Sequence, residues 1–339
     1  MLRAGLGRPT QAVEEEQAAN WRVSSGSAAV LGLCPLAMEV APTTAYLMLG
    51  ERCRRSCAFC AQARDSRAPE SALSRVLWPA FDAARIADAV AKAYAEGRIA
   101  RACYQVTVYP DFVEHSRAAV ALLAARCNIP ICVSIAAGRV EDVEALLAAG
   151  AERVTLALDA ATPTIYEQVK GGDWERAWLL LQECARRFPG RMGTHLIVGL
   201  GESEREMIER IQALNDIQIT IGLFALTPVK GTAWAEHNPP LLDAYRRVQA
   251  ARWLIVQGMA RAEAFHYDTS GRLISLGLSA DALRDLLRNG EAYRTAGCPG
   301  CNRPYYNERP GGTLYNYPRP LTEAEGAAET EALLRTLSG

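Results

Sequence analysis

Residues 50–60 read Gly50-Glu51-Arg52-Cys53-Arg54-Arg55-Ser56-Cys57-Ala58-Phe59-Cys60 and directly follow a short apolar run, residues 46–49. Three thiols therefore meet on one short loop with Cys-x3-Cys-x2-Cys spacing. Such a loop can hold three irons of a 4Fe-4S cluster. A tetrahedral zinc site normally takes four protein ligands, and no fourth Cys or His lies nearby in the sequence. The spacing indicates a cluster whose fourth iron is free for a substrate or cofactor, with three buried structural cysteines as the simpler alternative.

The composition limits the class of protein. The chain has 339 residues, a net charge of -1 and a hydrophobic content of 50%. That length allows one large domain or two ordinary ones, and the balanced charge points to neither nucleic acid nor a membrane surface. We find no signal peptide and no apolar run long enough to span a bilayer, so we expect a cytoplasmic protein. Ten cysteines then favour metal ligands, catalytic groups or small buried hydrophobes over disulfides.

From residue 43 onward, short apolar runs alternate with stretches in which apolar residues recur every three or four positions. We predict strands at residues 44–49, 102–108, 131–135, 153–158, 194–198, 220–225, 262–267 and 273–276. We predict helices between them at residues 81–96, 111–126, 140–149, 174–187, 203–214 and 241–257. Eight strands alternating with helices predict an α/β fold, a (β/α)8 TIM-type barrel whose chemistry collects at the carboxyl ends of the strands.

We divide the chain into three segments. The barrel is predicted to occupy residues 43–289, after an N-terminal extension, residues 1–42, that is polar and irregular around residues 20–27. The C-terminal segment, residues 290–339, carries a cysteine-containing loop rich in Gly, Pro, Asn, Tyr and Arg. A terminal helix is predicted at its end, where Thr322 and Glu325 have the spacing of a capping box.

A second motif reads His195-Leu196-Ile197-Val198-Gly199-Leu200-Gly201-Glu202, a strand that runs into a glycine turn and a helix. Gly199 and Gly201 would let the backbone approach a bound nucleoside, and the next helix offers free amides at its N-terminus. Such turns are routine in α/β folds, so structure alone is the alternative explanation. Asp159, after the fourth predicted strand, either faces this site or caps the helix that begins near Thr162.

The cysteine loop, with Phe59 directly before its last cysteine, resembles the radical S-adenosylmethionine (SAM) superfamily. The resemblance implies that Cys53, Cys57 and Cys60 hold a 4Fe-4S cluster that cleaves SAM to a 5'-deoxyadenosyl radical. It further implies an external electron donor. The residues that would bind SAM are Phe59, Asp159 at the ribose, Val229 beside the adenine, and the turn made by Gly199, Gly201 and Glu202.

A third motif reads Cys298-Pro299-Gly300-Cys301-Asn302-Arg303-Pro304-Tyr305-Tyr306-Asn307-Glu308. A Cys-x2-Cys pair in such a turn supplies two metal ligands. We predict that Cys103, in the second strand, and Cys34 complete four thiolates for a second cluster, suited to iron-sulfur or to zinc. The remaining cysteines lie among apolar neighbours and are predicted to be core residues: Cys127, Cys132 and Cys184.

The motifs also resemble biotin synthase, which holds a 2Fe-2S cluster through three cysteines and an arginine. Cys103 and Cys132 match its first two ligands, but Gly193 stands at the third position. The arginine is not evident in residues 265–268, which counts against that enzyme. The tail from Cys298 to Tyr317 instead resembles the two-component LipS-type lipoyl synthases.

This resemblance implies a radical SAM sulfurtransferase that inserts sulfur into an octanoyl chain on a lipoyl carrier domain. The sulfur would come from a sacrificial auxiliary 4Fe-4S cluster, and the tail would cover the barrel mouth. The implied partners are the octanoylated carrier protein, a paired lipoyl synthase subunit and an electron donor, with no nucleic acid or membrane. Arg303 and Arg309 would bind the carrier or neutralise cluster charge; the alternative is that they form salt bridges that order the loop. The alternatives are biotin synthase, another biotin-synthase-like enzyme, or a zinc-knuckle binding protein that does not cleave SAM.

Overall fold

A mostly parallel sheet organises the computed structural model, which describes residues 20–308 and 311–337. The sheet has eight strands in the order β10-β9-β8-β7-β6-β2-β1-β5. The pairings from β2 through β10 are all parallel, which confirms the predicted α/β fold. These six strands are β2 (Thr44–Leu49), β6 (Arg101–Val106), β7 (Ile131–Ser134), β8 (Arg153–Thr155), β9 (Met192–Val198) and β10 (Thr220–Ala225).

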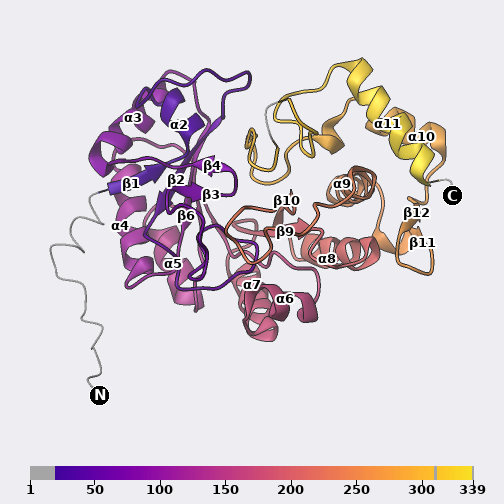
Figure 1. Cartoon of the computed structure of the whole chain (residues 1–339), viewed down its shortest axis with the longest axis horizontal. Coiled ribbons are helices and arrows are strands. Elements are labelled where there is room, and N and C mark those ends of the chain that lie inside the picture. The colour runs from indigo at the N-terminus through magenta and orange to yellow at the C-terminus, as the bar shows by residue number, and fades with distance from the viewer. Residues whose placement is uncertain (1–19, 309–310, 338–339) are drawn as a thin grey trace.

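Helices follow the parallel strands and cover the outer side of the sheet (Figure 1). Each buries an apolar stripe, as in α3, where Ile86, Val90 and Ala93 are buried and Asp82 accepts a hydrogen bond from the Arg85 N–H at the N-cap. The predicted helices are present, and α6 begins where we expected a helix near Thr162. The bounds are α3 (Ala83–Ala95), α4 (Phe112–Ala124), α5 (Val140–Ala148), α6 (Pro163–Lys170), α7 (Trp174–Arg187), α8 (Glu204–Asp216) and α9 (Leu242–Val256).

The N-terminal residues join the sheet, so our prediction that residues 20–27 are irregular was wrong. β1 (Asn20–Val23) pairs antiparallel with β2 and with β5 (Ala80–Asp82). Trp21 and Val23 are fully buried at alternate positions, which ties this strand to the core. A strand of four residues followed directly by helix α2 (Ser25–Val30) is too short to produce a clear periodicity. The division into three segments stays a prediction.

The seventh and eighth predicted strands do not join the sheet. Residues Ala262–Ala264 form a 3-10 turn, and β11 (His266–Tyr267) pairs antiparallel with β12 (Leu273–Ser275) in a separate hairpin. Asp268 accepts hydrogen bonds from the N–H groups of Ser270 and Arg272, so the chain turns back at once. A parallel crossover needs a dozen or more residues, which this connection lacks.

The C-terminal segment takes the place of the missing strands at the open side of the barrel. The Arg303 N–H donates to Tyr46 Oη on β2 at 2.9 Å. The Asn307 side-chain amide donates to the Ala225 carbonyl at the end of β10, also at 2.9 Å. Residues 303–307 therefore connect β10 to β2, two strands that do not pair directly.

The cysteine pair Cys298 and Cys301 lies at the amino end of the parallel strands. The Arg101 guanidinium, at the start of β6, donates to the Pro299 carbonyl at 2.8 Å, and the Thr43 hydroxyl donates to the Gly300 carbonyl at 2.5 Å. The prediction that this tail covers the barrel mouth was therefore wrong for the cysteine pair, which closes the opposite end.

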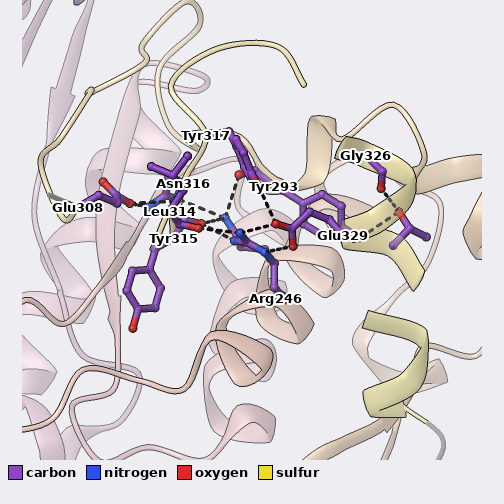
Figure 2. Close-up of polar contacts among 11 residues, drawn as sticks. Arg246, Tyr293, Glu308, Leu314, Tyr315, Asn316, Tyr317, Gly326 and Glu329 are labelled. Carbon is purple, nitrogen blue, oxygen red and sulfur yellow. Dashed lines mark hydrogen bonds and ion pairs between the residues drawn. The ribbon is translucent and has the colours of Figure 1, made fainter. Parts of the chain in front are cut away.

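A buried ion pair anchors the C-terminal segment to α9 (Figure 2). Arg246 pairs with Glu329 of α11 (Glu323–Leu337) at 2.7 Å, and only 4% of the Arg246 side chain is exposed. Its guanidinium also donates to the carbonyls of Leu314 and Tyr315 at 2.7 and 2.6 Å. Tyr317 donates its hydroxyl to Glu329 at 2.7 Å. One guanidinium thus fastens both the loop and the terminal helix.

The start of α11 confirms the predicted capping box. The Thr322 N–H donates to the Glu325 carboxylate at 2.8 Å, and the Glu325 N–H donates to the Thr322 hydroxyl at 3.2 Å. The remaining helical elements of this region are α10 (Ala280–Leu287) and the 3-10 turn η2 (Glu291–Tyr293).

We expect Arg246→Met to lower the free energy of unfolding by about 3–5 kcal/mol, because it leaves a buried carboxylate without its partner. Arg284→Ala is the control. Arg284 pairs with Glu331, which lies on α11 as Glu329 does, but both of these side chains are 46% exposed. Such an exposed pair contributes about 1 kcal/mol or less. Urea unfolding under anaerobic conditions measures both, and equal losses in the two variants would contradict the anchoring role.

Candidate functional site

The cysteine loop is shaped by its backbone contacts. Gly50, at the end of β2, has a φ of +91°, and a Cβ there would lie 2.3 Å from the Tyr109 ring, so only glycine fits. The Arg52 guanidinium donates to the carbonyls of Ala61, Ala63 and Ala68, and the loop wraps around it. The loop is therefore preformed by the protein.

The loop is also held by hydrogen bonds from three other segments of the chain. The Ala58 N–H donates to the Val169 carbonyl of α6 at 2.7 Å, and the Trp234 N–H donates to the Ala58 carbonyl at 3.1 Å. Cys53 Sγ accepts from the Val108 N–H, just beyond β6, at 3.2 Å. The loop thus sits at the carboxyl ends of the strands, where the prediction placed it.

Cys53, Cys57 and Cys60 line one cavity of about 520 Å³, which we call the SAM cavity. Burial raises the pKa of Cys57, and burial together with Cys57 raises the pKa of Cys60 to about 12. The Cys57 and Cys60 thiols are therefore protonated at neutral pH unless a metal replaces the proton, because a coordinating thiol is deprotonated.

The three thiols suit an iron-sulfur cluster by their chemistry. Among residues 20–308 and 311–337, no three His, Cys, Asp or Glu side chains lie close enough together to hold one metal ion. A 4Fe-4S cluster does not require such closeness, because each thiolate binds a different iron. Thiolate ligands select iron-sulfur clusters or zinc among the common metal groups.

Asp159 faces the SAM cavity and does not cap a helix. Thr162 is the N-cap of α6, where its hydroxyl accepts from the Ile165 N–H at 3.3 Å, so the capping alternative is wrong. The Asp159 carboxylate pairs with Lys170 at 2.7 Å, and both side chains are buried. Asp159 has a φ of +66°, a strained conformation that clusters at functional sites. Its ribose-binding role stays a prediction.

Lys170 is a functional candidate that the sequence analysis missed. It lines the SAM cavity, and its charge opposes the effect of burial on the pKa of Cys57. The residue lies on the buried side of α6 with Tyr166 and Val169. The helical spacing of these residues places a lysine on an apolar face. This pattern could have identified Lys170 from the sequence.

The glycine turn is closed by its own glutamate. Glu202 accepts hydrogen bonds from the N–H groups of Gly199 and Leu200 at 2.7 and 3.0 Å. Gly199 and Gly201 have φ values of +100° and +118°. None of Gly199, Gly201 and Glu202 lines the cavities described here, so their role in SAM binding stays a prediction.

Phe59 and Val229 do line a cavity next to the cysteines. This cavity of about 110 Å³ adjoins Cys60 and Asp159, and we call it the apolar cavity. Its walls are largely hydrophobic: Phe59, Ala61, Leu73, Ile197, Phe224, Ala225, Leu226 and Val229.

Four further cysteines line a separate cavity of about 80 Å³ inside the barrel, the thiol chamber: Cys103, Cys132, Cys298 and Cys301. Cys103 and Cys132 are register partners on β6 and β7. Cys298 Sγ lies 3.7 Å from Cys132 Sγ. The chamber thus joins two thiols of the sheet to two of the tail.

Cys132 takes the place that we predicted for Cys34. Cys34 is half-buried and does not line the thiol chamber. Cys132 was assigned to the core because Ile131 and Val133 flank it, and it is indeed buried, but its side chain faces the barrel interior. Alternate residues of a strand face opposite sides, so apolar neighbours do not fix the surroundings of Cys132.

Gly193 could not be replaced by the third cysteine of a biotin synthase site without displacing its neighbours. A Cβ at position 193 would lie 2.8 Å from Thr155 Oγ1 and 3.3 Å from the Thr220 carbonyl. The hydroxyl of Thr155 therefore occupies the space that such a side chain needs, and the cysteines of the tail complete the chamber instead.

His195 and Tyr306 line all three cavities. Burial lowers the pKa of His195 to about 4, so its imidazole is neutral at physiological pH. The pKa of Tyr306 is raised by burial and by both Cys60 and Cys103, which places its phenol between the two thiol sites. Phe224 packs edge-on against His195 and Tyr306, at 5.0 and 5.6 Å between ring centroids. These three rings separate the thiol chamber from the SAM cavity.

The two arginines of the tail are placed differently. Arg303 lines the thiol chamber and stacks over Phe224 at 3.8 Å. It faces the protein interior, so the neutralising alternative suits it better than carrier binding. Arg309 lies outside the described residues.

Residues 47–214 match the family model of the radical SAM superfamily and form a domain of that superfamily. A domain of this superfamily indicates an enzyme. No curated protein sequence matches the chain. No helix in the described part is both long and apolar enough to cross a lipid bilayer, and our expectation of a cytoplasmic location stays a prediction.

Solved structures of radical SAM enzymes share the fold. The FeFe-hydrogenase maturase HydG from Carboxydothermus hydrogenoformans is 18% identical, with a TM-score of 0.50 over 64% of this chain and 52% of HydG. A second HydG structure is 13% identical, with a TM-score of 0.52 over 64% of this chain and 51% of the other. Methylornithine synthase, PylB, is 12% identical, with a TM-score of 0.49 over 64% and 62% of the two chains. The match thus spans about half of HydG, and at these identities it shows the fold alone.

The half-buried Glu202 should make stability depend on pH. Burial raises its pKa from 4.5 to about 7, so between these values the folded state keeps a proton that the unfolded state has lost. Stability is therefore expected to fall as pH rises from about 5 to 7.5. We expect Glu202→Gln to reduce this slope in urea unfolding, with Glu206→Gln on the exposed side of the same turn as control. An unchanged slope in Glu202→Gln would contradict the assignment.

Proposed function

We propose that this radical SAM enzyme inserts sulfur into an octanoyl chain on a lipoyl carrier domain, as a subunit of a two-component lipoyl synthase. The observation that supports this function is the thiol chamber, in which four cysteines share a cavity that adjoins the SAM cavity through His195 and Tyr306. A sulfur-inserting enzyme needs a sulfur source beside its site of hydrogen abstraction, and a second iron-sulfur cluster is such a source.

The two thiol sites would divide the cofactors between them. Cys53, Cys57 and Cys60 would hold the 4Fe-4S cluster that binds SAM, and the thiol chamber would hold the auxiliary 4Fe-4S cluster. Together these groups supply radical carbon-hydrogen cleavage and sulfur, chemistry that amino-acid side chains lack. The work left to the protein is to hold the ligands, to bind and orient the chain and to exclude water.

The apolar cavity suits an alkyl substrate. A methylene chain carries no hydrogen-bonding group, and the walls contributed by Phe59, Leu73, Ile197 and Val229 offer none. The cavity also has polar walls, contributed by Ser74, Asp159, His195, Thr227, Tyr306 and Asn307, so the apolar walls suit methylene groups and the polar walls would meet any polar group of the substrate. The cavity adjoins Cys60, so a bound chain would lie next to the SAM-binding cysteines. The carrier protein, the paired subunit and the electron donor are part of the same proposal.

Iron and sulfide content tests the assignment of ligands. After anaerobic reconstitution we expect about eight irons per chain in the wild type and about four in Cys298→Ala/Cys301→Ala, because each 4Fe-4S cluster holds four irons. Cys132→Ala should lower the content in the same direction. Cys34→Ala is the matched control and should keep about eight irons.

Three results would contradict the proposal. About four irons in both the wild type and the double variant would remove the auxiliary cluster. Bound zinc without SAM cleavage would favour a zinc-knuckle protein. Eight irons and SAM cleavage, but no sulfur found by mass spectrometry in an octanoylated carrier domain incubated with the paired subunit, would leave a two-cluster radical SAM enzyme with another substrate.

A further inference from the structure

Three of the four thiols in the chamber have a hydrogen-bond partner from a neighbouring strand residue. The Gln105 amide donates to Cys103 Sγ at 3.1 Å. Tyr46 Oη lies 3.1 Å from Cys301 Sγ, and Thr155 Oγ1 lies 3.4 Å from Cys132 Sγ. Iron-sulfur sites differ in reduction potential partly through such hydrogen bonds to sulfur.

Metal binding would fix the direction of the bond from Tyr46. A cysteine that binds iron has no proton on its sulfur, so in the proposed site the Tyr46 O–H would donate to Cys301 while the Tyr46 oxygen accepts from the Arg303 N–H at 2.9 Å. Tyr46 therefore links the tail backbone to a tail thiol.

The Thr155 hydroxyl has room to point toward Cys132 because the residue opposite it, Gly193, has no side chain. Its Oγ1 would lie 2.8 Å from a Cβ at Gly193, and the two residues are register partners on β8 and β9. Glycine at this position leaves the room in which the hydroxyl reaches Cys132. The same glycine that rules out a third strand cysteine thus provides for a hydrogen-bond donor.

The fourth thiol, Cys298, lies near positive charge. Its pKa is raised by Cys132 and by burial, and the guanidinium groups of Arg101 and Arg153 oppose that rise. The Nε atoms of both arginines are buried without a hydrogen-bond partner. The indole N–H of Trp78, a residue that lines the chamber and is 1% exposed, also lacks an acceptor. Trp78 thus gives the chamber lining one buried donor without an acceptor, and the two arginines, which do not line the chamber, add positive charge near Cys298; both features suit a negatively charged ligand.

We propose that Tyr46, Gln105 and Thr155 form a hydrogen-bond shell that sets the reduction potential of the second iron-sulfur cluster. The inference rests on the auxiliary cluster of the proposed function. Donation to a thiolate sulfur stabilises the additional negative charge of the reduced cluster, so the shell raises the potential. These are positioning residues, because they act through the cysteines and do not touch the reacting carbon.

Two single variants remove one hydrogen bond each with little change in volume. Tyr46→Phe deletes only the hydroxyl, and Gln105→Leu deletes the amide. Tyr104→Phe is the control, because the Tyr104 hydroxyl donates to the Ala119 carbonyl at 3.1 Å on the other side of the same strand. All three are made in a Cys53→Ala/Cys57→Ala/Cys60→Ala background, so that any remaining cluster belongs to the chamber.

The measurement is an anaerobic redox titration followed by electron paramagnetic resonance, with iron counted on the same samples. We expect Tyr46→Phe and Gln105→Leu each to shift the midpoint potential in the negative direction, and the double variant to shift it further. Tyr104→Phe should not change it. If Tyr46→Phe does not fold, the midpoint potential of Gln105→Leu alone tests the proposal.

The failures can be told apart. About four irons in the triple-alanine background with an unchanged potential in both variants would overturn the shell and leave the proposed function intact. No iron in that background would show that the chamber holds no cluster, which overturns both proposals. An equal shift in Tyr104→Phe would assign the effect to general loosening and also overturn the shell.

Discussion

The sheet does not close on itself, because β10 does not pair with a strand at the opposite edge. The rest of the structure depends on how this gap is filled. A strand at an open edge leaves backbone N–H and C=O groups unpaired. Here the C-terminal segment fills the gap, with Asn307 bound to Ala225 and the Arg303 backbone bound to Tyr46. The same segment carries Cys298 and Cys301, so the segment that closes the barrel also completes the thiol chamber. The buried Arg246 pair, by holding this segment, supports both.

Burial decides the charge of the cysteines. Taking a thiolate out of water is costly, and burial accordingly raises the pKa values of Cys57, Cys60 and Cys298. Each site nevertheless contains buried cations: Lys170 beside the cysteine loop, and Arg101 with Arg153 beside the chamber. A buried cation needs a negative partner. Lys170 has Asp159 and Arg101 has Glu152 as ion-pair partners, and Arg153 donates to the hydroxyl of Thr220.

The sequence predicted the parts of the fold that depend on local pattern. β2 and β10 were placed with their observed bounds, because each is an apolar run that ends at a polar or glycine boundary. The hairpin after α9 was not predicted, since only the turn at Asp268 distinguishes it from a barrel strand. Cys34 was chosen over Cys132 by its place in the sequence. The actual neighbour of Cys298 depends on where the tail crosses the barrel, which no local pattern encodes.

The arrangement of the two thiol sites narrows the chemistry. They lie toward opposite ends of one barrel interior, and His195, Phe224 and Tyr306 stand between them. The imidazole of His195 is neutral, and of the three rings only His195 and Tyr306 carry polar atoms. An uncharged chain would therefore lie in this region without a large desolvation cost. A charged substrate would have to shed its hydration at the same place. Under the proposed function, the reacting part of the substrate would be an uncharged hydrocarbon in this interior and its polar part would stay at the mouth, as in an acyl chain tethered to a carrier.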